Sequence, residues 1–296
     1  MNRALFYLLL LTVFCLTFPA PLSAAEKGIL LTEEVQLKVA DSFMSEGEYY
    51  RAVTEYKKFL ILFPDSEQSD SVLFKIGMAY YQGDEFETAA RAFTSVGVRY
   101  PDSRYAPTAG YHAGLCYWRL DRLDEAAAAF TSVATRYPAS VDAPRALLET
   151  SLVEFDRKDL AGSRRELERF LAAYPQDNRS EKARDAITLL DRDRELPRKS
   201  PVVAGLLSAL VPGAGHIYAG HYGDGVTSFF LNGLFIAGTV VAVQQENYAV
   251  AGVVGVIGLP FYLGNIYGAA NAATKWNISV RKELRGTLAV TLDSPF

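Results

Sequence analysis

The feature that most constrains this 296-residue chain is an internal repeat with a step of 37 residues. An aromatic residue followed by proline recurs four times, at Phe63-Pro64, Tyr100-Pro101, Tyr137-Pro138 and Tyr174-Pro175. Proline lacks a backbone N–H and disfavours a helical conformation in the residue before it, so each pair predicts the end of a helix. A fixed period of this length is typical of stacked repeat units rather than of a single globular core.

Two classes of residue keep the same step inside each unit. Small residues recur at two positions, which are Ala40, Gly77, Gly114 and Ser151, and then Ala52, Ala89, Ala126 and Ser163. Large apolar residues recur at two others, which are Tyr49, Phe86, Leu123 and Leu160, and then Tyr56, Phe93, Phe130 and Leu167. Small residues let two antiparallel helices approach closely, and large residues at helical spacing fill the groove between them. Each unit is therefore predicted to be a pair of antiparallel helices.

The spacing inside a unit resembles that of the tetratricopeptide repeat. The two small residues and the proline are twelve apart, as in Gly77, Ala89 and Pro101. The family's usual unit is shorter by three, and the added residues follow the proline, as in Asp102-Ser103. Units of this length are similar to those of bacterial periplasmic members, such as the lipoprotein of the β-barrel assembly machinery and the Tol-system coordinator. The resemblance implies an all-α fold in which a solenoid binds other proteins.

We place the repeat domain at residues 33–196. Its four units are expected at about 33–69, 70–106, 107–143 and 144–180, and residues 181–195 are predicted to form a polar closing helix. A solenoid needs such an end because its last unit would otherwise expose an apolar face to water.

The resemblance also implies which residues line the concave surface, since in this family the first helix of each pair does so. They are Phe74, Met78, Tyr81, Tyr111, Leu115, Trp118, Arg119, Leu152 and Phe155. Our functional interpretation is a groove for an apolar or amphipathic segment of a partner protein. Tyr111 and Trp118 would be the anchors, because aromatic residues carry much of the binding energy in such interfaces. The competing interpretation is that some of these side chains pack against neighbouring helices or against the closing helix.

The first 25 residues predict a secretory signal peptide. Arg3 is followed by an apolar stretch from Leu5 to Phe18 and by the small residues Ser23-Ala24-Ala25. The apolar stretch is short for a membrane span, which favours cleavage over retention. We therefore expect a protein of the bacterial cell envelope, held in the inner membrane with its repeats facing the periplasm.

After a linker at residues 197–200 the composition changes to that of a membrane domain, which we place at 201–274. Two uncharged runs, 225–245 and 247–274, are long enough to cross a bilayer and predict spans at about 226–245 and 249–271. Residues 201–221 are interrupted by Pro212-Gly213-Ala214-Gly215 and are expected to be re-entrant or interfacial. Residues 275–296 are expected to form a polar tail.

Pro212-Gly213-Ala214-Gly215 and the following Tyr218-Ala219-Gly220 resemble the signature of small bacterial membrane-hairpin domains. That resemblance implies two packed transmembrane helices. Small-residue faces such as Gly252, Gly255 and Gly258 favour close helix packing and suggest a homo- or hetero-oligomer in contact with membrane lipid.

The side on which the tail lies stays open at this point. Two spans would leave Lys275, Arg281, Lys282 and Arg285 outside the cytoplasm together with the repeats, against the positive-inside tendency. Three spans would bring the tail inside. We prefer two spans plus a re-entrant segment.

No pattern in the sequence predicts catalysis. The net charge is −4, which gives no electrostatic footprint for nucleic acid. Phosphate-binding loops, zinc-protease helices and nucleophile elbows do not occur in it, so we expect neither an enzyme nor a cofactor. The spacing of His216, His221 and Asp224 does not place them on one helical face, and no metal site is expected there. The leading interpretation is a scaffold, and the alternative is a transport or secretion subunit whose working part is the hairpin.

Overall fold

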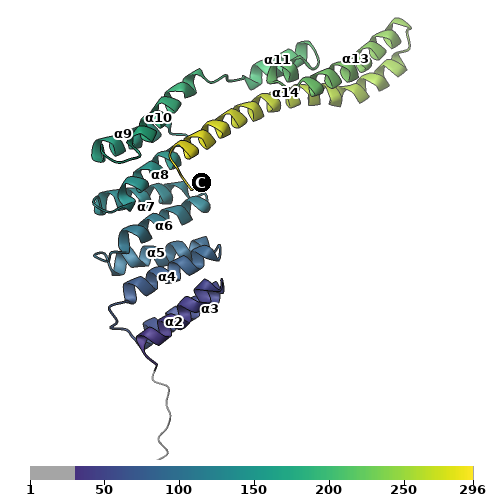
Figure 1. Ribbon diagram of the computed structural model, residues 1–296. Helices are drawn as coiled ribbons and strands as arrows, with labels where there is room; N and C mark the ends of the chain where they lie inside the picture. Colours follow the sequence, from purple (N-terminus) through teal and green to yellow (C-terminus); the bar gives the residue numbers. More distant parts are fainter. Residues whose placement is uncertain (1–30, 296) are drawn as a thin grey trace, which may run out of the picture. The chain divides into compact units, whose positions relative to one another are not determined.

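The computed structural model describes residues 31–295, and this part of the chain is built of helices, which confirms the predicted all-α fold. It divides at Pro64 into two compact units. The first unit holds one pair, α2 (Glu33–Ser45) and α3 (Tyr49–Leu62). The second unit holds three further pairs: α4 (Ser69–Gln82) with α5 (Phe86–Arg99), α6 (Ala106–Arg119) with α7 (Leu123–Arg136), and α8 (Asp142–Asp156) with α9 (Leu160–Ala173) (Figure 1).

The second helix of each pair obeys the repeat at both ends. Helices α3, α5, α7 and α9 have 14 residues each, and they begin 37 residues apart. Each ends just before the aromatic residue of an aromatic–proline pair, whose φ lies between −133° and −129°. The proline forces this extended conformation on the residue before it, and the helix stops there.

The small residues of the repeat permit close contact between the two helices of a pair. A Cβ atom placed on Gly77 would lie 2.6 Å from the ring of Phe93, and one placed on Gly114 would lie 2.6 Å from the ring of Phe130. Both rings are completely buried. The aromatic side chain of the second helix therefore rests directly on the backbone of the first.

The turn inside each pair uses a left-handed residue at one repeat position. These residues are Gly47, Asp84, Asp121 and Lys158, with φ between 57° and 76°. Helices commonly end with a residue in the left-handed conformation, and glycine, asparagine and aspartate tolerate this conformation best. Lys158 is thus the least suited of the four.

The last pair is followed by α10 (Ser180–Asp191) and the short 3-10 helix η1 (Arg192–Glu195). Helix α10 contacts α9 and buries Ala183, Ala186 and Leu190 in the same cluster as the third and fourth pairs. Helix α10 therefore packs on the last pair of the repeats.

The remaining helices are α11 (Pro201–Leu210), α12 (Ala214–Ala219), α13 (Tyr222–Gln244) and α14 (Tyr248–Thr291), and they are largely apolar as far as Thr274. Helices α13 and α14 form a hairpin, and α11 and α12 pack against α14 (Figure 1). Within residues 31–295, α13 and α14 are the two helices that are long and apolar enough to cross a membrane. Helix α11, with 10 residues, is too short to do so.

The break between α11 and α12 is held together by polar contacts with α14. Gly213 has a φ of 86°, and a Cβ atom on it would lie 2.0 Å from the backbone oxygen of Gly225. Its N–H donates to Oδ1 of Asn265 at 2.9 Å, and Nδ2 of Asn265 donates to the carbonyl of Ser208 at 3.0 Å. The N–H of Gly215 donates to Oγ of Ser208 at 3.1 Å. Backbone groups freed by the break are therefore paired inside the protein, as an apolar environment requires.

Helix α14 is 44 residues long and continues far beyond the expected span at 249–271. The expected polar tail, residues 275–296, is helical as far as Thr291. The end of this helix contacts α8 and α10 of the repeats (Figure 1).

Candidate functional site

The residues expected to line the groove lie on α4, α6 and α8. Five of them belong to one buried apolar cluster, which comprises Tyr111, Leu115, Trp118, Leu152 and Phe155 among its members. Tyr81 is partly buried against the same cluster. Phe74 and Met78 are half-buried outside it, and Arg119 is exposed. The structure therefore brings six of the nine residues together and leaves three at the edge.

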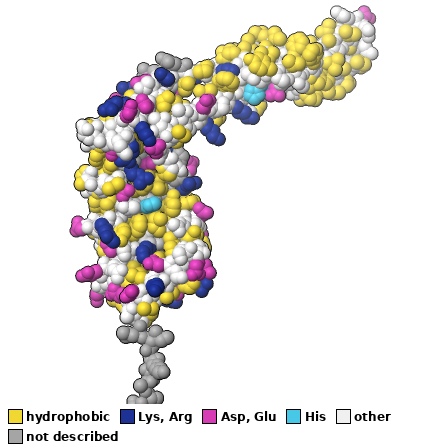
Figure 2. Space-filling model, in the orientation of Figure 1, with side chains coloured by type: hydrophobic (Ala, Val, Ile, Leu, Met, Phe, Trp, Pro, Cys, Tyr) yellow, Lys and Arg dark blue, Asp and Glu magenta, His cyan; other side chains and the backbone are white. Residues whose placement is uncertain are grey.

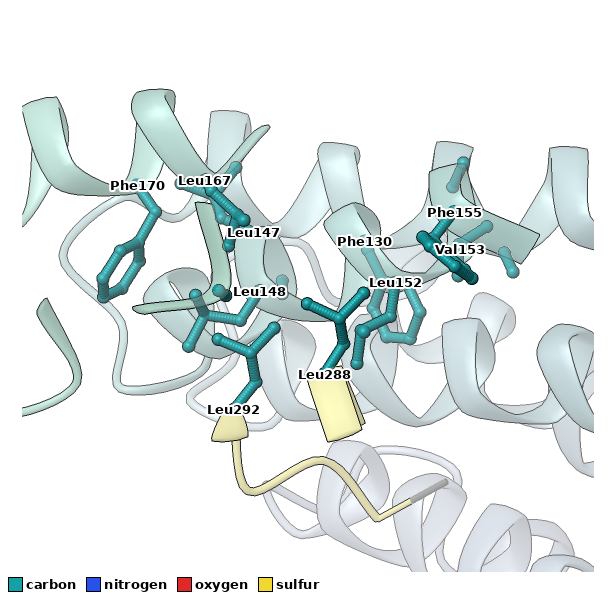
Figure 3. Close-up of a cluster of buried hydrophobic side chains, with 14 of the residues drawn as sticks. Phe130, Leu147, Leu148, Leu152, Val153, Phe155, Leu167, Phe170, Leu288 and Leu292 are labelled. Atoms are coloured by element: carbon teal, nitrogen blue, oxygen red, sulfur yellow. The ribbon is translucent and has the colours of Figure 1, made fainter. Parts of the chain in front are cut away.

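The cluster is completed by the end of α14. Leu284, Leu288 and Leu292 are spaced i, i+4 and i+8, and they are 9%, 1% and 4% exposed. Leu288 and Leu292 point toward Leu148 and Leu152 of α8 (Figure 3). The predicted groove residues of the third and fourth pairs are thus covered by the chain's own residues 281–294, which we call the C-terminal segment.

Charged contacts hold the C-terminal segment against the C-terminal ends of α6 and α8. Nε of Arg285 donates to Oδ1 of Asp156 at 2.8 Å, and Nε1 of Trp118 donates to Oδ2 of the same carboxylate at 3.0 Å. The Arg285 guanidinium also lies 5.1 Å from the Trp118 ring centre. Arg281 donates to the backbone oxygen of Phe155 at 2.9 Å and lies over its ring. Arginine suits this position because its planar group can pair with a carboxylate and stack on an aromatic ring together.

A second polar contact holds the segment's last residues. The carboxylate of Glu149 on α8 is 5% exposed. It accepts hydrogen bonds from the hydroxyl of Ser294 at 2.7 Å and from that of Tyr111 at 3.2 Å. Burial raises the pKa of Glu149, and these two hydrogen bonds oppose the rise. Lys182 of α10 also pairs with Asp293.

His112 of α6 lies among aromatic side chains of α4, α5 and α6. Its ring stacks on Phe93 with 5.3 Å between centres and lies 5.6 Å from Tyr81 and 6.1 Å from Phe74. Its Nδ1 atom is buried and has no hydrogen-bond partner among the described residues. Burial lowers the pKa of His112, an effect that the Asp142 carboxylate opposes. A neutral imidazole therefore lies among aromatic rings next to the predicted binding surface.

Sequence reasoning missed His112 and Glu149. Both occupy one repeat position, which holds Lys38 and Lys75 in the earlier units. A polar residue at a repeat position that is usually exposed does not by itself predict a buried or functional side chain. The signal was the change from lysine to histidine and glutamate where neighbouring units and α14 cover the position.

The three residues weighed as metal ligands are only partly together. Nδ1 of His221 lies 3.2 Å from Oδ2 of Asp224, whereas the His216 side chain is buried beside Gly268 of α14. Among residues 31–295 no group of three or more His, Cys, Asp and Glu side chains is arranged to hold a metal ion.

Comparison with known proteins supports the reading of the repeats. Residues 34–66, 71–103 and 113–178 match families described as tetratricopeptide repeat. A search of curated proteins found no matching relative.

Several solved structures are similar at low identity. A tetratricopeptide repeat protein from Parabacteroides merdae is 14% identical, with 88% of this chain and 99% of that chain covered and a TM-score of 0.46. The apo form of RapI is 12% identical, with coverages of 78% and 64% and a TM-score of 0.46. PilF of Pseudomonas aeruginosa is 15% identical, with coverages of 83% and 97% and a TM-score of 0.40. The matched segments, residues 34–66, 71–103 and 113–178, are identified by the family matches as tetratricopeptide repeats.

Proposed function

We propose that this chain is a membrane-anchored tetratricopeptide scaffold of the bacterial cell envelope that holds a partner protein during envelope assembly or trafficking. The observation that carries the proposal is the course of α14, which runs as one helix from the apolar hairpin to the groove of α6 and α8. Leucines and arginines of a helix fit that groove, so its shape and charge suit an amphipathic segment. Two connections, the linker at 197–200 and the C-terminal segment, attach the repeats to the hairpin.

The partner site proposed is the whole concave surface predicted from the sequence, used in two parts. Phe74, Met78 and Tyr81 offer partly exposed apolar area that the C-terminal segment leaves uncovered, with Arg119 at its rim. The buried part around Trp118 becomes available only when the C-terminal segment leaves. A partner therefore docks first on the α4 side of the groove.

A crosslinking experiment in cells tests this placement. A photo-reactive residue replaces Met78 in the groove, and a matched one replaces Val98, which is 73% exposed on α5. The expected result is a partner crosslink from position 78 that is absent from position 98. Equal capture from both positions would place the partner elsewhere.

The contact between the C-terminal segment and α8 supports two membrane crossings. Segments in contact lie on the same side of a membrane, so the chain must cross it an even number of times between α10 and residue 281. Helices α13 and α14 supply two crossings, and α11 is too short for a third. This supports the preferred topology of two spans plus a re-entrant segment.

The periplasmic side is proposed from the predicted signal peptide, residues 1–25, which lie outside the described part. Cysteines at Val98 and at the exposed Gly286 report the side of the repeats and of the tail, respectively. With a thiol reagent that does not cross the inner membrane, we expect both to be labelled in intact cells. If both cysteines were labelled only after lysis, the repeats and the tail would lie on the cytoplasmic side. If only one of them were labelled in intact cells, two crossings would be refuted.

The alternative function, in which the hairpin is the working part of a transport or secretion complex, is favoured by two observations. The network of Asn265, Ser208 and Gly213 is more elaborate than a tether needs. Also, Oδ1 of Asn232 is buried without a hydrogen-bond partner among the described residues. Full-length variants separate the two functions in a deletion strain at matched membrane levels. Loss of rescue by Asn265→Leu, with Met78→Asp still active, favours the hairpin, and the reverse favours the groove.

An oligomer through the glycine-rich helices also remains a proposal. Gly258 packs on Phe235 within the hairpin, but Gly252 and Gly264 have open space where a Cβ atom would be. These two positions leave room for a helix of another copy. Crosslinking between cysteines at position 252 in membranes tests it, and failure to form dimers there would exclude this face.

A further inference from the structure

A pocket of about 330 Å³ lies where the chain passes from the repeats to the apolar helices. Three segments form it: the turn between α8 and α9, the linker that follows η1, and α14 near residue 277. Each segment contributes one cation to the lining, namely Lys158, Arg198 and Arg281. A volume of this size falls at the lower end of the range of small-ligand sites, about 300 to 1,000 Å³.

The linker is held firmly against α14 beside this pocket. The N–H of Lys199 donates to Oδ1 of Asn277 at 2.9 Å, and Nδ2 of Asn277 donates to the carbonyl of Lys199 at 2.8 Å. Nε1 of Trp276 donates to the carbonyl of Pro197 at 3.3 Å. The linker segment that carries Arg198 is therefore held in place by hydrogen bonds to α14.

Positive charge in the pocket exceeds negative charge. Arg198 pairs with Asp193 at 2.6 Å, and Asp193 is 4% exposed. Arg281 donates to a backbone carbonyl and has no carboxylate partner among the side chains that the structure describes, which exclude those of residues 194 and 195. The Lys158 ammonium makes no ion pair or side-chain hydrogen bond with a described residue. Among the described side chains, these two cations therefore have no acidic partner and can contact an anion.

Lys158 departs from the repeat in a way that packing does not explain. Its left-handed position holds Gly47, Asp84 and Asp121 in the other units, and a lysine there carries more backbone strain than glycine. The substitution also reverses the charge of the two preceding units. Backbone strain at Lys158, together with the change from a negative to a positive side chain, indicates that the lysine is kept there to bind an anionic ligand.

The pocket lies at the level where both chain segments become apolar. The uncharged run of α14 ends at Thr274, and that of α11 begins at Ser200. Trp276, with the Lys199 ammonium 3.4 Å from its ring centre, is an aromatic residue typical of the membrane interface. Lys and Arg side chains gather where the apolar surface of the α13–α14 arm meets the repeats (Figure 2). In a bilayer that held the uncharged runs, the phosphate groups of the lipids would lie at this depth.

We propose that this pocket binds the phosphate of an anionic phospholipid, with Lys158 and Arg281 on the phosphate oxygens. Lipid is favoured over a free phosphate because Leu196, Pro197 and the exposed Ile278 add an apolar wall for the glycerol and first acyl carbons. The site explains why cations stand on the side of the membrane where the positive-inside tendency disfavours them. It rests on the membrane anchoring proposed above.

The test measures lipid binding to the purified full chain in detergent by native mass spectrometry, with phosphatidylglycerol or phosphatidylcholine added. We expect selective binding of phosphatidylglycerol. Lys158→Gly should weaken it about fivefold, and the double variant with Arg281→Gln about 25-fold, from the usual contribution of a cation at an anionic membrane. Lys158→Gly keeps the turn, because glycine stands at the same position of the first unit.

The matched control is Lys275→Gln with Lys282→Gln, which removes two exposed charges from the same stretch of α14 outside the pocket. It should change binding less than twofold. An equal loss in the control would show diffuse surface attraction and overturn the site. Competition by glycerol phosphate as effective as the lipid itself would overturn the choice of lipid.

Flotation with neutral phosphatidylcholine vesicles separates failure of this site from failure of the anchoring. A chain that floats but lacks headgroup selectivity refutes the pocket alone. A chain that does not float refutes the membrane anchoring and the pocket with it.

Discussion

Replacing Leu288 by alanine should release the C-terminal segment from the repeat groove. Leu288 is 1% exposed and lies against α8 in the cluster that includes Leu148 and Leu152. Removing a buried leucine side chain costs about 2 to 5 kcal/mol, the lost transfer energy plus the cavity left behind. With about 3 kcal/mol assigned to this site, the ratio of docked to undocked segment falls on the order of 100-fold.

Hydrogen exchange of the full chain in lipid nanodiscs measures this change directly. Peptides that cover residues 281–292 should lose protection on the order of 100-fold, because undocking exposes their amides to water. Peptides from α4 and α5 should keep theirs. A second signal is the fluorescence of Trp118, which is 8% exposed under Arg285 and should shift to the red when the segment leaves.

The control is Val290→Ala, which makes a similar truncation on the same helix at a side chain that is 79% exposed. It should leave protection of the segment within a few-fold of the original. If Leu288→Ala behaved like this control, or if α4 and α5 lost protection to the same extent as the segment, the docked segment would not be a separable ligand of the groove.

Three further outcomes follow from the repeat core and its buried ionisable groups. Gly114→Ala should destabilise the fold by about 1–3 kcal/mol, because its Cβ atom would meet the Phe130 ring at 2.6 Å. Gly97→Ala has open space around the new Cβ atom and should stabilise the fold by about 0.5–1 kcal/mol. Chemical denaturation measures both changes. Glu149→Gln should raise stability near pH 7 by about 1 kcal/mol. The raised pKa of Glu149 means that the original protein loses stability as pH rises above 4.5 through the folded-state value, and the variant should lack that loss. The lowered pKa of His112 predicts the opposite dependence on pH. The stability that neutral His112 contributes is complete above pH 6.5 and is lost as the pH falls from there toward the folded-state pKa. Denaturation curves of His112→Phe over a pH series should lack this dependence. A flat profile in the original protein would contradict the burial argument.

The helix pairs could be predicted from the sequence because each depends on short-range rules. A proline ends the helix before it, and a glycine opposite Phe93 or Phe130 leaves room for the ring within one unit. These relations repeat every 37 residues, so four weak local signals support one another. The same rules identified the chain break at Pro212-Gly213, although the partner that repairs it, Asn265, lies 52 residues away from Gly213.

The occupant of the groove could not be predicted in that way. Residues 275–296 were expected to be a polar tail because charged residues are frequent in them, and the leucine stripe at 284, 288 and 292 predicts an amphipathic helix without saying which surface it covers. The answer depends on a contact between Arg285 and Asp156, which are 129 residues apart. Local periodicity records which face of a helix is apolar, but the surface that buries this face is chosen by the packing of the whole chain. For this protein, the sequence therefore determines the repeats, and tertiary packing determines that the chain's own last helix lies against them.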